Sequence, residues 1–570
     1  MPCESRGDPG GWRARVRSVA TAAAVIALGN VASRLLGLVR EQVMAALFGA
    51  TGSTDAFVAA SAVPQMVYDL LVGGAISAAL VPTFVDIADD DERLGALVSS
   101  VLTVVALALT VVALMLGLAA PLVVAVLAAG FDAEQQAEAA TMVRVMLVAV
   151  VLQGLAGILM SVLYARRRNA LPAFAVAVYN GGIIVAALAM HQWLGAYALV
   201  VGVVVGAVGQ LLLQLPGLGR VRLRPRLDRR QPELRAISRL YLPVVLGMLV
   251  TVVGIVYDRY LASGLAEGSL SVMNYATRLI QFPLGLVGTA VSFAVLAPLA
   301  RHAGVLAQFT GDTGGPVTAG SAVRGAGAEG TAARGEGSEV DDARGADAHA
   351  AYRQTLRFGV RMVIVLMVPA TVGLMVLSEP LVRLLFERGR FGDVETARTA
   401  LVLLAYAPQL PFTALDQVFI VAFYARRDTR TPVLVGVATV LLYMVSANAL
   451  MSRLDVAGLA LANAIQNSAH GLILLALLER AGVGVMDRRL VGFACRVVAA
   501  SAVMGASVWW TAALVLTGGE AALDLAASLI GLAALAGAVY FVALELLGVR
   551  DGRDAVLAIV AKGRARSALP

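Results

Sequence analysis

Apolar residues fill most of the chain in runs long enough to cross a bilayer, which takes about 20 helical residues. The runs are continuous, whereas barrel strands alternate apolar and polar positions over about ten residues. Helices satisfy their own backbone in lipid. We therefore predict an all-α integral membrane protein with about fourteen transmembrane helices. They are expected at residues 18–47, 55–86, 96–118, 139–164, 171–192, 195–216, 234–260, 270–299, 355–378, 394–424, 431–451, 455–479, 488–516 and 522–548, with a short amphipathic piece from Glu379 to Gly389.

Composition supports this interpretation. The 570 residues are 59% hydrophobic and 15% charged, with a mean hydropathy of +0.82. A soluble protein needs more polar surface. The net charge of +7 would suit nucleic acid, but arginine also collects in the cytoplasmic loops of membrane proteins. We therefore expect membrane lipids as partners and no nucleic acid.

Loop charges predict that both termini are cytoplasmic. The inside segments include the three arginines 166–168, the basic stretch 220–239 and the C-terminal tail. The outside loops 49–54, 192–194 and 517–524 have no lysine or arginine. One outside loop breaks the rule with Arg383, Arg388, Arg390 and Arg398.

An internal repeat predicts two related halves. Residues 163–172 (LYARRRNALP) resemble residues 423–432 (FYARRDTRTP), and 73–79 (GGAISAA) echo 288–294 (GTAVSFA). The members of each pair are six predicted helices apart. Because an even shift preserves the direction in which a helix crosses the membrane, the two repeats are parallel. A central cavity is therefore expected between two lobes. The predicted organisation is a cytoplasmic N-terminus (1–17), an N-lobe (18–216), a basic loop (217–233), a C-lobe (234–480), two further helices (481–548) and a cytoplasmic tail (549–570).

Residues 302–350 differ from the rest of the C-lobe. They are dominated by Gly, Ala, Ser, Thr and acidic residues, with Phe309 the one aromatic residue before Tyr352. Such a composition cannot bury a core. We expect a disordered cytoplasmic insertion that serves as a linker; a regulatory role is the alternative.

The sequence argues against catalysis. Lys562 is the only lysine and follows no glycine-rich turn, so there is no P-loop for ATP. The acidic run 89–92 would suit a metal-dependent glycosyltransferase, but a solvated loop explains it better. His470 has polar neighbours on its helix but no candidate nucleophile. We expect no cofactor and no metal-dependent chemistry.

Charges inside apolar helices are the candidate binding residues. Arg34, Arg40 and Arg278 each cost about 2.5–3.5 kcal/mol at the bilayer centre on insertion scales, so they are expected to face a cavity. A guanidinium suits a diphosphate because its planar fork donates two parallel hydrogen bonds. The alternative is an arginine that snorkels to the interface.

Other polar residues lie in the predicted helices. Asp258 is a candidate cation site, and its alternative is pairing with Arg259. Asn463, Asn467 and His470 form a stripe with Gln466, which either lines a pathway or joins helices by hydrogen bonds. Asp69 and Asp416 are further acids, for which the sequence suggests no partner.

Several motifs together resemble the MurJ/MviN family of lipid II flippases. They are 33–40 (SRLLGLVR), 48–49 (FG), 55–57 (DAF), 79–82 (ALVP), 275–283 (YATRLIQFP), 384–391 (LLFERGRF) and 423–432. The resemblance implies the MOP exporter fold, similar to the MATE transporters, with two six-helix lobes around a cationic cavity and two C-terminal helices that form an apolar groove. It implies that Arg34, Arg40 and Arg278 hold the lipid's pyrophosphate and that Asp258 matches the acid of a sodium site.

Helix two departs from the family pattern. The family usually has two arginines and a glutamate where this chain has Tyr68, Asp69 and Gly73. Loss of a phosphate-binding arginine weakens the case for lipid II itself but not for the fold. We expect Asp55, Tyr68, Asp69, Asn463 and Asn467 to line the cavity.

The sequence therefore predicts a flippase that moves lipid II, or a related polyprenyl-linked glycolipid, from the inner to the outer leaflet of the bacterial plasma membrane. Transport by alternating access would use Na⁺ or H⁺ as the coupling ion and serve peptidoglycan synthesis beside the cell-wall machinery. The alternatives are an exporter of another lipid-linked oligosaccharide (O-antigen or capsule units) or of drugs, and a non-transporting cell-wall scaffold.

Overall fold

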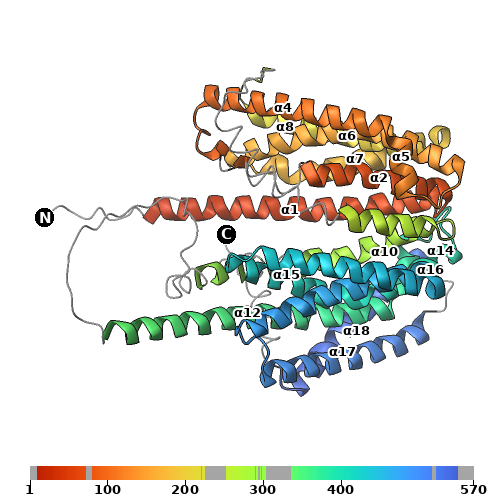
Figure 1. The fold of residues 1–570 in the computed structure, drawn as a ribbon. Coiled ribbons are helices and arrows are strands. Elements are labelled where there is room, and N and C mark those ends of the chain that lie inside the picture. Colours follow the sequence, from red (N-terminus) through yellow and green to blue (C-terminus); the bar gives the residue numbers. More distant parts are fainter. Residues whose placement is uncertain are drawn as a thin grey trace. The chain divides into compact units, whose positions relative to one another are not determined.

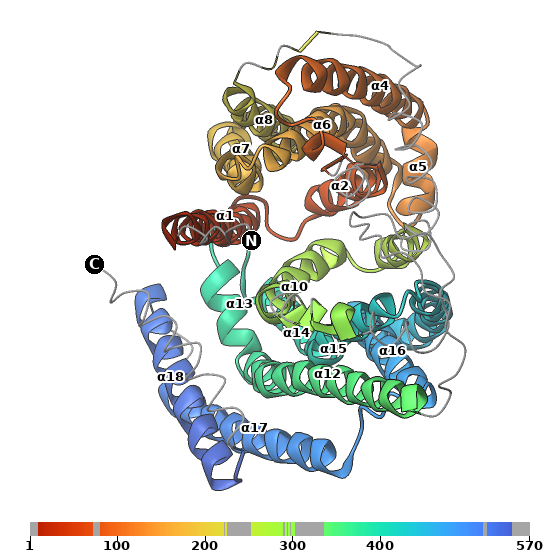
Figure 2. The same cartoon turned by 90° about the vertical axis from the view of Figure 1, so that its left-hand side faces the viewer.

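The computed structural model describes residues 9–71, 80–81, 83–219, 221, 223–224, 252–288, 291–292, 295–296, 298–302, 336–516 and 521–549. Every regular element in these ranges is a helix (Figures 1 and 2). Among the described residues, eight helices are long and apolar enough to cross a membrane. The all-α membrane prediction is confirmed, while the count of fourteen spans stays a prediction.

The chain divides into two compact units, residues 1–278 with 385–400 and residues 279–384 with 401–570. The organisation predicted from the sequence, an N-lobe ending at residue 216 and a C-lobe beginning at residue 234, stays a prediction. Polar contacts tie residues 260–278 to the early helices of the first unit. The backbone N–H of Gly130 donates to the hydroxyl of Ser263 at 3.1 Å, and Asp55 accepts the backbone N–H of Gly268 at 2.7 Å.

In unit 1, α6 packs between α4, α2 and α8, and α7 packs between α8 and α1 (Figure 2). Aspartates begin two of these helices: Asp90 accepts the N–H groups of Glu92 and Arg93, and Asp132 accepts that of Gln135. The helices are α1 (Pro9–Phe48), α2 (Gly52–Leu71), α4 (Asp91–Leu118), α5 (Ala120–Leu127), α6 (Ala133–Ala165), α7 (Ala170–Leu194), α8 (Tyr197–Gln214), η1 (Leu215–Leu218), one at 252–263 and most of α10 (Ser269–Pro283).

In unit 2, α12 packs against α15 and α17, and α17 packs against α18. The hydroxyl of Tyr540 donates to the carbonyl of Val365 at 2.7 Å and fixes α18 to α12. The last two helices therefore share the core of this unit. The elements are η2 (Leu284–Gly288), α12 (Glu336–Val376), α13 (Ser378–Phe386), α14 (Asp393–Tyr406), η3 (Ala407–Gln409), α15 (Leu410–Ala425), α16 (Arg430–Arg480), α17 (Arg488–Val515) and α18 (Ala522–Leu546), with α13 and α14 contributing residues 385–400 to unit 1.

Much apolar surface is left outside the two cores. On α4, the most apolar span has a mean hydropathy of 2.7, yet only 11% of it is buried within the protein. Leu114, Met115 and Leu118 of α4 are each more than 60% exposed. A surface of this kind is stable against lipid rather than water.

One expectation is corrected, and one helix was not predicted. Residues 336–350 form the start of α12, although disorder was expected for the whole of 302–350. This stretch contains several alanines, which favour helix more than any other residue. The rest of the insertion, 303–335, lies outside the described residues, as does most of the helix expected at 234–260. The short helix α5 was not predicted; it starts where Pro121 can occupy the first turn.

The unbroken label α16 covers two helices. Asp455 interrupts the helical backbone with φ 52° and ψ −137°. The ring of His470 lies 3.3 Å from the carbonyl oxygen of Pro432. The two residues are 38 positions apart, so in a straight helix they would be separated by about 57 Å. The chain therefore folds back at Asp455, and the predicted helices at 431–451 and 455–479 are confirmed.

The backbone preserves the internal repeat. Arg167 (φ 58°) ends α6 and Arg427 (φ 62°), 260 residues later, ends α15. In each case the residue after it donates to a carbonyl five residues back, from Arg168 to Leu163 and from Asp428 to Phe423. The following hairpins also match at a shift of 260, because Gly195 (φ 54°, ψ −137°) corresponds to Asp455.

This correspondence gives a stability prediction. A side chain strains the backbone at φ 52°, ψ −137°, a region that glycine occupies freely. We expect Asp455→Gly to raise the free energy of unfolding by about 1 kcal/mol, measured as a higher melting temperature in detergent.

The reverse change in the other hairpin is the matched control. A Cβ at Gly195 would meet no atom within 4 Å, so Gly195→Ala tests backbone strain alone. It should lower the melting temperature. An unchanged or lower melting temperature in Asp455→Gly would contradict the assigned strain.

Candidate substrate-binding site

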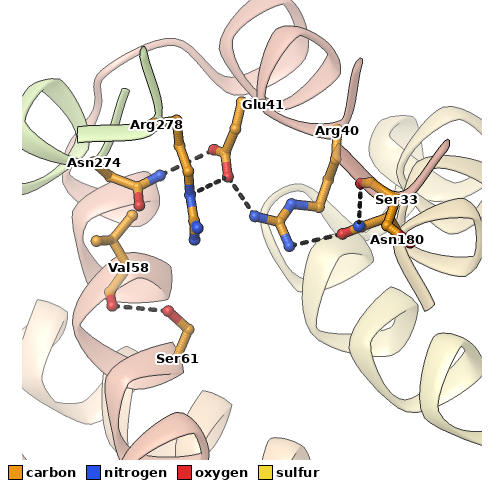
Figure 3. A network of polar contacts seen from close by, with 8 residues as sticks. All are labelled: Ser33, Arg40, Glu41, Val58, Ser61, Asn180, Asn274 and Arg278. Atoms are coloured by element: carbon orange, nitrogen blue, oxygen red, sulfur yellow. Dashed lines mark hydrogen bonds and ion pairs between the residues drawn. The ribbon is translucent and has the colours of Figure 1, made fainter. Parts of the chain in front are cut away.

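A buried carboxylate, Glu41, lies at the centre of a polar network in unit 1 (Figure 3). Its side chain is 1% exposed. One carboxylate oxygen pairs with the guanidinium of Arg40 and lies 3.2 Å from Nε of Arg278. The other oxygen accepts a hydrogen bond of 2.9 Å from the Asn274 amide. One acid thus joins two arginines from helices far apart in the sequence.

Helix α7 holds Arg40 from the other side. Nη1 of Arg40 donates to the Asn180 side-chain oxygen at 3.1 Å, and the Asn180 amide donates to the Ser33 carbonyl at 3.3 Å. The close approach of α1 and α7 requires a glycine, because a Cβ at Gly29 would lie 2.3 Å from the carbonyl oxygen of Ala173. The packing of the two helices therefore sets the direction of the Arg40 side chain.

Helix α10 supplies Asn274 and Arg278, which are four residues apart and so share one face. Asp55 fixes the start of this helix: its carboxylate accepts the N–H of Gly268 at 2.7 Å, the N–H of Ser271 at 2.8 Å and the Ser271 hydroxyl at 2.6 Å. Asp55 is 4% exposed. It acts as a cap for α10 and does not line the cavity described below.

An aromatic cluster also fixes α10 against the end of α1. The hydroxyl of Tyr275 donates to the Gly49 carbonyl at 3.0 Å, and its ring packs against Phe386 and Phe391 at centroid distances of 5.2 and 5.5 Å. Gly389 allows the approach, since a Cβ there would lie 2.2 Å from the Ala46 carbonyl oxygen. Several motifs that carry the family resemblance meet in this cluster.

The network opens on a cavity of about 170 Å³. Its volume is several times the roughly 30 Å³ of one water molecule, so a small polar group fits. Helices α1, α2, α7, α8, 252–263 and α10 form the walls. The polar lining residues are Arg40, Glu41, Ser61, Gln65, Tyr179, Arg259, Asn274 and Arg278.

The charges of this lining favour an anion. Arg40, Arg259 and Arg278 contribute three positive charges against the one negative charge of Glu41. Arg278 keeps 43% of its side-chain surface exposed, while Arg40 keeps 19%. Guanidinium groups in such a site bind phosphate oxygens in pairs of hydrogen bonds. The geometry therefore suits a phosphate-bearing ligand.

The structure brings together two of the three predicted arginines. Arg40 and Arg278 share Glu41, but Arg34 is exposed on α1 and is not part of the cavity lining. Arg34 and Arg40 lie on one continuous helix, α1, which includes Gly37 between them. Arg34 remains a predicted binding residue about 9 Å further along the helix.

The other predicted positions lie around or away from the cavity. Asp258 is half-buried next to Arg259, and in the described part of the chain no three acidic, His or Cys side chains gather as metal ligands would. Its role in cation binding stays a prediction. Tyr68 and Asp69 are half-buried on α2 beyond Gln65, whose amide donates to Asp69 at 2.9 Å.

Asn463 and Asn467 belong to unit 2. The amide of Asn467 donates to the side-chain oxygen of Gln409 at 2.5 Å and to that of Asn463 at 3.0 Å. These contacts join α16 to η3. Of the two alternatives for the polar stripe, helix joining accounts for the hydrogen bonds seen here.

The sequence analysis missed most of the polar lining, namely Glu41, Ser61, Gln65, Tyr179, Asn274 and Arg259 as a lining residue, and it also missed Asn180, which holds Arg40. A signal was present for two of them. Glu41 is an acid inside an apolar helix next to an arginine, and Asn274 precedes Arg278 by one helical turn. Nothing in the sequence indicated that Asn180 would meet α1.

Comparison with known proteins agrees with this site. A family model described as "Lipid II flippase MurJ" matches residues 44–307 and 341–526. The chain belongs to this family. The family consists of membrane transporters, so the chain is a multi-pass membrane transporter and neither a hydrolase nor an ATPase. The match is interrupted at 308–340, inside the unusual insertion.

Curated relatives match along nearly their whole length. A probable lipid II flippase MurJ from Vibrio cholerae is 29% identical over 92% of this chain and 95% of its own length. The lipid II flippase MurJ of Burkholderia cenocepacia is 29% identical over 84% and 87%. A probable lipid II flippase MurJ from Rhizobium meliloti is 30% identical over 91% of this chain and 92% of its own length.

Solved structures show the same fold. A lipid II flippase MurJ in an inward closed conformation has a TM-score of 0.71 at 19% identity and covers 94% of this chain and all of its own. An inward-facing multidrug-resistance MATE transporter of the MOP superfamily has a TM-score of 0.59 at 13% identity, over 79% and 94%. The predicted MOP exporter fold is confirmed.

The network predicts the effect of removing its one acid. Glu41→Gln keeps the size of the side chain but removes the negative charge that the two arginines share, which is strongly destabilising in a buried site. Because Arg278 is partly exposed, we expect the free energy of unfolding to fall by about 2 kcal/mol, measured by thermal unfolding in detergent.

Asp524→Asn is the control for this measurement. It removes a carboxylate from the exposed first turn of α18 and should change stability by less than about 0.5 kcal/mol. Equal melting temperatures for Glu41→Gln and the unchanged protein would show that Glu41 does not stabilise the two arginines.

Proposed function

We propose that this chain is a flippase for lipid II, the polyprenyl-diphosphate-linked precursor of peptidoglycan. One observation carries the proposal: a member of the lipid II flippase family has a cavity in which Glu41 joins Arg40 and Arg278. The diphosphate of the lipid supplies the negative charge that the cavity lacks.

In this proposal Glu41 positions the arginines and the arginines bind the diphosphate. Glu41 holds Nε of Arg278 and the guanidinium of Arg40, which fixes the direction of both forks. The cavity is too small for a whole disaccharide-peptide head group. It receives the diphosphate while the sugar occupies water and the polyprenyl chain stays in lipid. Arg34, about 9 Å along α1, would then be a second contact on the same path.

We place the protein in the bacterial plasma membrane with both termini in the cytoplasm, as the arginine-rich loops favour. The inside-negative membrane potential then assists transport. It provides about 2.3 kcal/mol per charge at 100 mV for moving an anion outward by alternating access. The coupling ion is proposed to be Na⁺ or H⁺, with Asp258 as the candidate sodium residue, and the cell-wall synthesis machinery is the proposed partner.

The experiment is complementation of a strain depleted of its own lipid II flippase. The unchanged chain should restore growth, whereas Arg278→Ala should not, although the protein is present in the membrane. Arg34→Ala should also fail. We expect flipping in both variants to fall at least about 100-fold, because a charge-assisted contact to phosphate contributes about 3 kcal/mol.

Arg93→Ala is the matched control, since Arg93 is an arginine 79% exposed outside the cavity. It should grow normally. Normal growth of Arg278→Ala cells would exclude the proposed role of the cavity. If the unchanged chain fails to complement while it exports another glycolipid or drugs from vesicles, the substrate assignment is wrong.

A further inference from the structure

Unit 2 contains a second charged pair, which is half-buried and separate from the arginine cavity. Nδ1 of His470 lies 2.6 Å from a carboxylate oxygen of Asp416, and Nε2 lies 3.3 Å from the carbonyl oxygen of Pro432. The two side chains are only 14% and 18% exposed. The pair joins three segments: α15, the second half of α16 and the first turn of α16.

With the Asp416 carboxylate ionised, the two hydrogen bonds determine the protonation state of His470. An ionised carboxylate and a backbone carbonyl can only accept hydrogen bonds. Each ring nitrogen of His470 faces one of these acceptors, so both nitrogens must carry a proton for both bonds to form. The ring is then an imidazolium paired with a carboxylate, which makes burial of both charges tolerable.

The surrounding helices leave space for the ring. A Cβ at Gly436 would lie 3.8 Å from Nε2 of His470, and one at Gly471 would lie 3.0 Å from the Phe412 carbonyl oxygen. Glycine at 471 therefore permits the close approach of α15 and α16 on which the pair depends.

Other charged groups lie away from the pair. Asp416 is the only charged residue of α15, and α16 has the others near its ends and its turn: Arg430, Arg453, Asp455, Glu479 and Arg480. Helix α12 also packs on α15, but Arg357 of α12 bonds to Asp487 and Arg361 lies over the ring of Phe493. In the described residues, Asp416 alone balances the imidazolium.

The first repeat shows that the fold does not need this pair. At the shift of 260 residues, Asp416 corresponds to Ala156 and His470 to Gln210, which are 0% and 5% exposed. Pro172 matches Pro432. The same helix, turn and hairpin therefore form in unit 1 without a titratable group. The shared fold therefore does not require a charged pair at these two positions.

We propose that His470 and Asp416 form a proton-binding site in unit 2. When His470 loses one proton, the remaining proton stays on Nδ1, between the ring and the carboxylate. Nε2 then presents a lone pair to the Pro432 carbonyl, and that contact becomes repulsive. Proton release thus breaks the contact between the first turn of α16 and its second half, while the hydrogen bond from His470 to Asp416 of α15 remains.

The transport consequence rests on the proposed function, because a proton bound and released in unit 2 would couple flipping to protons. Proton binding itself does not rest on it. The two are therefore tested by separate measurements.

The first test measures protonation directly by NMR of the full chain in nanodiscs with ¹⁵N-labelled histidine. The chain has four histidines, and His470→Gln identifies the signal of interest. Both ring nitrogens of His470 should be protonated at pH 7. Asp416→Asn keeps the hydrogen-bond acceptor but removes the charge, so one ring nitrogen should lose its proton. Asp416→Glu should retain both.

A neutral His470 ring at pH 7 in the unchanged protein would overturn the proposal. So would an imidazolium that Asp416→Asn leaves unaltered. Folding is controlled by the double variant Asp416→Ala with His470→Gln, which installs the residues of the first repeat and should melt like the unchanged protein.

The second test measures the rate of lipid II flipping in proteoliposomes from about pH 6 to about pH 9. In the unchanged protein the flipping rate should depend on pH, and beyond the midpoint of the His470 titration it should change by up to about tenfold per pH unit. The flipping rate of the double variant should not depend on pH. An identical pH profile in both proteins would exclude coupling to this site. If no lipid II moves in any variant but His470 titrates as stated, the proposed function fails and the proton site stands.

Discussion

The ion pairs of Glu41 determine how the cationic cavity can exist inside a membrane protein. Two guanidinium groups close together repel each other strongly where little water is present. Glu41 contacts both Arg40 and Arg278 and reduces that repulsion without cancelling the positive charge of the lining. The remaining charge is what an anionic ligand can bind. The same carboxylate thus serves the stability of unit 1 and the affinity of its cavity, and these two requirements cannot be changed independently.

Residues outside the cavity hold Arg40, Glu41 and Arg278 in position relative to one another. Asp55 caps α10, Tyr275 bonds to the end of α1, and Gly29 lets α1 approach α7. Each of these contacts fixes a helix rather than a ligand. A misplacement of about 1 Å at the reacting groups is enough to lose much of an enzyme's rate, and the same sensitivity is expected of a bidentate phosphate site. This explains why motifs scattered between residues 48 and 391 converge on one end of α1.

The sequence predicted helices well because apolar runs of bilayer length leave few alternatives. It also identified Arg40 and Arg278, because a charged residue inside an apolar transmembrane helix is costly and usually has a function. It could not identify Asn180, whose role depends on the approach of α1 to α7, nor separate Arg34 from Arg40, because the path of a helix past its neighbours is a tertiary property. Asp55 was expected at the cavity for want of that information, and it caps a helix instead. The contacts Gly130–Ser263 and Asp55–Gly268, which tie residues 260–278 to unit 1, could not be predicted from the sequence for the same reason.

The two repeats share their backbone turns but differ in many of their side chains. Backbone turns are the same at Arg167 and Arg427 and at Gly195 and Asp455, because turn geometry decides where each helix goes. At the latter pair the geometry persisted even though aspartate is strained where glycine is not. Side chains within the helices diverged, so that Ala156 and Gln210 in one repeat correspond to Asp416 and His470 in the other. Since the fold tolerates either set, the side chains of each repeat were free to acquire separate chemistry, with arginines in unit 1 and a histidine–carboxylate pair in unit 2.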